Sequence, residues 1–105
     1  MAKFLLAYTG GGSMGDTPEE QQKMMEAWMN WFGSLGDDVV DMGNPFGPSC
    51  TVSSTGAVRT GAPGALSGYS IIDADSISDA ASKAKGCPVL SGGGAIEVYE
   101  TMPVG

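Results

Sequence analysis

The strongest structural signal in the sequence is one long amphipathic helix that begins beside Thr17. Thr17 can accept hydrogen bonds from free backbone N–H groups, Pro18 suits the first helical position, and Glu20 completes a capping box. Gly36 supplies a left-handed stop. Between these ends, large apolar residues recur at helical spacing: Met24, Trp28, Trp31, Phe32 and Leu35. Helical spacing favours a stripe in the core or a subunit interface over a methionine-lined ligand cavity.

Four further segments carry the patterns of β-strands. They span residues 3–8, 39–42, 68–74 and 95–101. The first is apolar on both faces, which predicts a central strand covered on two sides. Between the second and the third, the turn Ser54-Thr55-Gly56 separates two short extended segments and indicates a small hairpin.

A second helix is predicted after Ser76, which forms a capping pair with Asp79. Gly86 and Pro88 should end this helix. The order is strand, helix, strand with a hairpin, strand, helix, strand, which is the βαββαβ pattern of the ferredoxin-like fold. We therefore predict one α+β domain over residues 1–105, with an antiparallel sheet and two helices on one of its faces.

Alternation along the strands sorts the side chains onto the two faces of this sheet. The face under the helices is predicted to carry Leu5, Ala7, Ile72, Ile96 and Val98. The opposite face is predicted to carry Phe4, Leu6, Tyr8, Tyr69, Ile71, Glu97 and Tyr99. A shift of one residue in the pairing register of a strand would exchange its assignments.

Charge and composition restrict the partners of the chain. The net charge is −7 and the five basic residues are scattered, so nucleic acid and anionic membrane surfaces are not expected as partners. No apolar run approaches the length of about 20 residues that spans a bilayer, and no signal peptide is visible, so we expect a cytoplasmic protein. Only 16% of the residues are charged and 42% are hydrophobic, which fits a surface partly buried in a homodimer.

The sequence contains no histidine. This removes the Ser–His and Cys–His nucleophile arrangements and the usual transition-metal ligand. Cys50 and Cys87 are too few and too far apart for a disulfide framework, and we expect both to be thiols. The glycine runs at 10–12 and 92–94 match neither the P-loop nor the dinucleotide fingerprint. We therefore predict no metal and no nicotinamide or flavin cofactor.

The candidate site combines tyrosines with a carboxylate. Tyr8, Tyr69 and Tyr99 all fall in predicted strands, and Glu97 shares a face with Tyr99. Burying a carboxylate among aromatic rings requires donors, which tyrosine hydroxyls can supply. The alternative is that Glu97 reaches solvent at the rim of the sheet. Asp41 belongs to an acidic cluster with Asp37 and Asp38, which could either transfer protons or be solvated.

Several segments together, in order, resemble the YCII-related, DGPF-type proteins. They are VDMGNPF at 40–46, LSGYSI at 66–71, ADS at 74–76, AKGCP at 84–88 and GAIEVYE at 94–100. The resemblance covers nearly the whole chain and implies a dimeric α/β-barrel, in which two ferredoxin-like sheets meet face to face. The tetrapeptide that names the group corresponds to Thr60-Gly61-Ala62-Pro63, so only its glycine is kept. Some members are thought to use a His–Asp pair, for which Asp41 would be the acidic member, but this chain has no histidine.

These observations predict a small dimeric ligand-binding or accessory protein that holds a small organic molecule in the barrel. The predicted binding residues are Tyr8, Tyr69, Glu97 and Tyr99. The alternative is a cofactor-free lyase or isomerase, in which Glu97 or Asp41 transfers a proton and the tyrosines orient the substrate. The absence of histidine favours binding, and the fold by itself cannot decide.

Overall fold

A computed structural model of the chain describes residues 2–10, 17–61 and 66–103. Its main sheet has four strands, each antiparallel to its neighbours. Their spatial order is β2 (Val39–Asp41), β5 (Gly68–Ala74), β1 (Ala2–Thr9) and β6 (Ala95–Glu100). The order places β1 in the interior of the sheet, as predicted, and is compatible with the ferredoxin-like arrangement.

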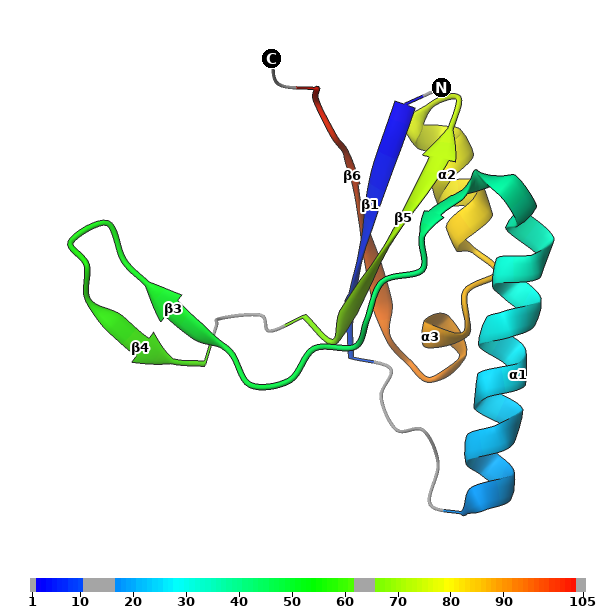
Figure 1. Cartoon of the computed structure of the whole chain (residues 1–105), viewed down its shortest axis with the longest axis horizontal. Coiled ribbons are helices and arrows are strands. Elements are labelled where there is room, and N and C mark those ends of the chain that lie inside the picture. The colour runs from blue at the N-terminus through cyan, green and yellow to red at the C-terminus, as the bar shows by residue number, and fades with distance from the viewer. Residues whose placement is uncertain (1, 11–16, 62–65, 104–105) are drawn as a thin grey trace.

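The helices of the described residues lie on one side of this sheet (Figure 1). They are α1 (Pro18–Leu35), α2 (Ile77–Ala84) and the four-residue α3 (Pro88–Ser91), with a 3₁₀ turn η1 (Gly36–Asp38) after α1. The chain is therefore an α+β protein with an antiparallel sheet, as the order of the predicted elements implied. The sequence did not predict α3, because Pro88 was interpreted only as the end of the preceding helix, although proline also favours a first helical position.

The long helix begins and ends where the sequence predicts. The side chain of Thr17 accepts a hydrogen bond from the backbone N–H of Glu20 at 3.1 Å, and Gly36 has a φ of 58° after the last turn. Trp31 is buried, and its indole Nε1 donates to the carbonyl of Lys83 at 3.0 Å, which ties α1 to α2. The apolar stripe of α1 therefore packs in the core of this chain.

The core lies between the sheet and the helices. Its buried members are Phe4, Leu6, Tyr8, Trp31, Ile72, Ala74, Ala80, Ala84, Cys87 and Val89. Ile96 and Val98 are half-buried against this cluster. For β5 and β6 the predicted faces are thus correct, since Ile72, Ile96 and Val98 all pack on the helix side.

For β1 the predicted faces are wrong. Phe4, Leu6 and Tyr8 pack under the helices, whereas Leu5 and Ala7 belong to the other face. The pairing register fixes this, because Leu6 lies opposite Val98 and residues directly opposite each other share a face. Both faces of β1 are apolar, so alternation alone could not decide which of them the helices cover.

A two-stranded hairpin, β3 (Cys50–Val52) and β4 (Val58–Thr60), stands apart from the main sheet. We call residues 50–60 the hairpin arm. Figure 1 shows the arm extending on the side of the strands away from the helices. The radius of gyration is 15.2 Å, compared with about 13 Å expected for a compact chain of this length. The arm is the feature that makes the chain extended.

Candidate functional site

The face of the main sheet opposite the helices carries most of the predicted site residues, and we call it the open face. The register assigns eleven side chains to it: Lys3, Leu5, Ala7, Thr9, Asp41, Tyr69, Ile71, Asp73, Ala95, Glu97 and Tyr99. Leu5 lies opposite both Ile71 and Tyr99, and Ala7 lies opposite both Tyr69 and Glu97. The open face therefore has two neighbouring rows, one largely apolar and one in which an alanine separates a tyrosine from a carboxylate.

Tyr69 and Asp41 are in contact at one edge of the open face. The hydroxyl of Tyr69 donates to Asp41 Oδ2 at 3.4 Å, and the ring of Phe46 stacks on that of Tyr69 with centroids 5.6 Å apart. The other carboxylate oxygen of Asp41 accepts a hydrogen bond from the backbone N–H of Gly43 at 2.9 Å. A phenol, a carboxylate and a flat aromatic ring are thus held together on the surface.

Gly43 is required for this arrangement. Its φ is 76°, and a Cβ atom at this position would lie 1.7 Å from the carbonyl oxygen of Tyr69. The pairing register between β2 and β5 also shifts between Val39 and Asp41, which is typical of a β-bulge. The bulge and the close approach of Gly43 together direct the Asp41 carboxylate toward Tyr69.

Glu97 and Tyr99 lie on β6, at the opposite edge of the sheet. Both are exposed, and Tyr99 keeps 54% of its surface accessible to solvent. Two strands separate β6 from β2, so Glu97 and Asp41 of one chain are about 14 Å apart at ordinary strand spacing. The two carboxylates of a single chain therefore cannot act together on one bond of a small molecule.

Tyr8 does not share a surface with the other tyrosines. Its hydroxyl donates to Ser70 Oγ at 2.6 Å beneath the helices, and its ring meets the edge of Trp28 at 5.4 Å. Ser70 in turn donates to the carbonyl of Met42 at 2.7 Å. Burial raises the pKa of Tyr8 far above its ordinary value, which the hydrogen bond with Ser70 only partly opposes. Tyr8 and Ser70 are structural residues that fasten the segment after Asp41 to β5.

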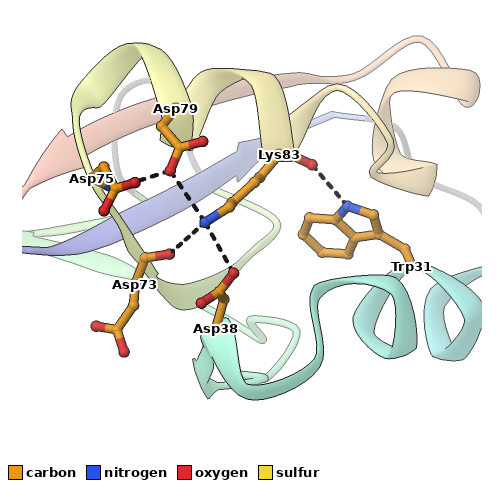
Figure 2. Close-up of polar contacts among 6 residues, drawn as sticks. All are labelled: Trp31, Asp38, Asp73, Asp75, Asp79 and Lys83. Atoms are coloured by element: carbon orange, nitrogen blue, oxygen red, sulfur yellow. Dashed lines mark hydrogen bonds and ion pairs between the residues drawn. The ribbon is translucent and has the colours of Figure 1, made fainter. Parts of the chain in front are cut away.

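The acidic cluster predicted after α1 does not form a single site. Figure 2 shows Asp38 on the helix side of the sheet, where its Oδ2 lies 3.0 Å from Lys83 Nζ. The same Nζ lies 3.2 Å from Asp79 Oδ2 and donates to the carbonyl of Asp73 at 3.2 Å. Asp41 lies on the open face instead. Asp38 thus belongs to an ion pair that connects η1, β5 and α2, while Asp41 remains a candidate site residue.

The two cysteines occupy different environments. Cys87 is buried beside Tyr8, and burial raises the pKa of its thiol to about 11, so it is a structural thiol at neutral pH. Cys50 is exposed on the hairpin arm. Of the two, only Cys50 is accessible to a reagent in the folded chain.

Within the residues that the structure describes, no group of three or more acidic or cysteine side chains could hold a metal ion, and no helix is long and apolar enough to cross a membrane. Residues 11–12 of the first glycine run, and Ala62 and Pro63 of the segment compared with the DGPF tetrapeptide, lie outside the described residues. A shallow depression lined by residues of α1, including Met25 and Met29, lies away from the open face and contains no predicted site residue.

Sequence reasoning brought together three of the four predicted binding residues, and it missed Phe46 in the site and the structural residue Ser70. Tyr69, Glu97 and Tyr99 share the open face, whereas Tyr8 does not. Phe46 was not singled out, although an aromatic residue between two prolines at an irregular edge was a usable signal. Ser70 was also missed, and a serine within an apolar strand is the kind of residue that needs a buried partner.

A comparison of the chain with models of protein families and with curated proteins found no significant match.

Proposed function

We propose that the chain is a homodimeric ligand-binding or accessory protein of the YCII-related type, in which two open faces meet and enclose a cavity for a small organic molecule. The observation that carries the proposal is the uneven covering of the sheet. All helices of the described residues pack on one face, while Leu5, Ile71 and Tyr99 form an apolar row on the other. An apolar row in the middle of a sheet is typical of a surface that is covered by a partner.

A second copy is the simplest cover, because a two-fold interface is self-complementary. The apolar row of one copy can pack on that of the other, which removes apolar surface from water at about 25 cal/mol per Å². Asp41 lies at the end of that row beside Ile71, and Tyr69 and Glu97 belong to the neighbouring row, so these polar groups would line the remaining space. Ala7 separates Tyr69 from Glu97 and is only 2% exposed, so the side chains of Tyr69 and Glu97 would face a ligand held between two sheets.

The dimer is tested by placing a charge in the apolar row. Leu5→Glu should convert a dimer into a folded monomer, measured by native mass spectrometry and sedimentation, with the circular dichroism spectrum unchanged. Ile77→Glu is the matched control, because Ile77 is an apolar residue with 53% exposure on the helix side. It should leave the dimer intact. A wild-type chain that stays monomeric at micromolar concentration would contradict the proposed interface.

Ligand binding is tested separately by a thermal-shift screen against small organic metabolites. A compound that binds in the cavity should raise the melting temperature, and Glu97→Gln should weaken that shift while leaving the dimer intact. The same shift in the wild type and in Glu97→Gln and Tyr69→Phe variants would place the ligand elsewhere. Asn30→Asp, on the exposed side of α1, is a control that should leave the shift unchanged.

One contact supports the second candidate function, a cofactor-free proton-transfer enzyme. The hydrogen bond from Tyr69 to Asp41 pairs a proton donor with a carboxylate on an accessible surface. Such a pair can remove a proton from a bound molecule and orient it for the transfer. Turnover of a ligand found in the screen, lost in both Asp41→Asn and Tyr69→Phe, would support the enzyme. Binding without turnover would support the accessory protein.

A further inference from the structure

We propose that the hairpin arm docks on the second copy through its valine face and closes one end of the cavity between the two open faces. This inference rests on the proposed dimer and adds to it a contribution from the partner. Each copy would give one arm and receive one, so the cavity of a single chain would be incomplete without its partner.

The arm is not supported by its own chain. The hydrogen bonds that the structure gives to residues 50–60 all remain within residues 49–61. Val52 and Val58 lie directly opposite each other on the two strands, and each is 66% exposed. A two-stranded hairpin alone is only marginally stable in water. An arm with paired, exposed valines therefore has an apolar face for which its own chain provides no cover in the described structure.

The arm leaves the main sheet in the direction that a partner would occupy. Figure 1 shows the helices on one side of the strands and the arm on the other. The segment that leads to the arm is fastened to the sheet where Pro45 bridges to Gly68, at the start of β5. Tyr69, Ala7 and Glu97 form a row close to this end of the open face, with only Thr9 and Ala95 beyond it. A second copy facing the open face would therefore lie beside the arm, next to the candidate binding residues.

The area of the open face by itself is too small for an ordinary dimer. The four strands contain 8, 7, 6 and 3 residues, and at about 4.8 Å spacing and about 3.3 Å rise they give a face of about 380 Å². Stable interfaces bury about 800 Å² on each partner. One face of the two three-residue strands of the arm covers about 95 Å² by the same spacings. An arm that docks on the second copy therefore adds buried area that the open face by itself lacks.

The two faces of the arm supply a matched pair of positions for the test. Val58 and Arg59 are neighbours on β4, and alternation directs their side chains to opposite faces. The photo-crosslinking residue p-benzoylphenylalanine is introduced in place of Val58 in one variant and in place of Arg59 in the other. After irradiation, the variant substituted at Val58 should form a covalent species of twice the chain mass, with crosslinks to the main sheet of an isotopically labelled second copy. The variant substituted at Arg59 should form much less of it.

A second measurement keeps the inference independent of the crosslinking chemistry. Val52→Lys combined with Val58→Lys should raise the dissociation constant of the dimer by about tenfold or more, which corresponds to about 1.4 kcal/mol. Arg59→Gln, on the other face of the arm, should leave it unchanged. A dimer with equal crosslinking from both positions and an unchanged dissociation constant would overturn the docking of the arm while leaving the open-face dimer in place. A chain without any dimer would overturn both proposals.

Discussion

Replacement of Gly43 by alanine tests how the candidate site is positioned. Two separate costs act at this residue. The φ of 76° lies in the left-handed region, which costs a residue with a side chain about 1–2 kcal/mol. In addition, the new Cβ would lie 1.7 Å from the carbonyl oxygen of Tyr69, so the segment has to move away from β5. This movement breaks the hydrogen bond from the buried Ser70 hydroxyl to the carbonyl of Met42, a loss of about 1–3 kcal/mol. Gly43→Ala should therefore lower the free energy of unfolding by about 2–5 kcal/mol.

Two other glycines separate these costs. Gly93 has a φ of 86°, and a Cβ atom added there would meet no atom within 4 Å, so Gly93→Ala should cost only the conformational part, about 1–2 kcal/mol. Gly33 lies in α1 with ordinary φ and open space, so Gly33→Ala should stabilise the protein by up to about 1 kcal/mol. Urea denaturation at one protein concentration measures all three. A cost for Gly43→Ala no larger than that for Gly93→Ala would refute the close contact with Tyr69.

Two further predictions concern titratable groups on the helix side of the sheet. The pKa of Asp79 is lowered first by the hydrogen bond from the backbone N–H of Asp75 and then by Lys83. The ionised carboxylate therefore stabilises the fold at a pH above its unfolded pKa of about 3.9. This contribution to stability is lost as the pH falls through the lower pKa of the folded state. The melting temperature should therefore fall less steeply between about pH 5 and pH 2 in Asp79→Asn than in the wild type, and equal slopes would contradict this. Burial raises the pKa of the Cys87 thiol to about 11, so little of it is thiolate at about pH 8. A Cys50→Ser variant, in which Cys87 is the remaining cysteine, should therefore not react with a disulfide reagent at that pH until denaturant is added. Fast reaction in native buffer would instead show that Cys87 is accessible.

The secondary structure was predictable because its signals are local. The cap at Thr17, the stop at Gly36 and the strand at 68–74 all depend on residues close in sequence, and the structure has each of them. The acidic cluster was not predictable in the same way. Asp38 and Asp41 are separated by only two residues, but the 3₁₀ turn and the bulge direct them to opposite sides of the sheet. Proximity in sequence therefore indicated a shared site where the fold provides none.

The candidate site was predictable on the strands whose two faces differ. On β6, apolar Ile96 and Val98 alternate with Glu97 and Tyr99, so only one arrangement buries the apolar pair. On β5, in the same way, Ile72 is buried under the helices and Tyr69 lies on the opposite face. The prediction that these tyrosines and Glu97 bind a ligand stays a prediction, whereas their common face follows from the register.

The faces of β1 depend on a constraint that comes from its neighbour. Ser70 on β5 is fully buried, so its hydroxyl must have hydrogen-bond partners within the protein. Leu6 lies directly opposite Ser70 and cannot supply one, but Tyr8 lies at the diagonal position on the same face, within reach of a long side chain. The hydroxyl of Tyr8 bonds Ser70 at 2.6 Å, as this constraint requires. The face of β1 that carries the Tyr8 hydroxyl is thus the face that can bury Ser70, and this makes Tyr8 a core residue.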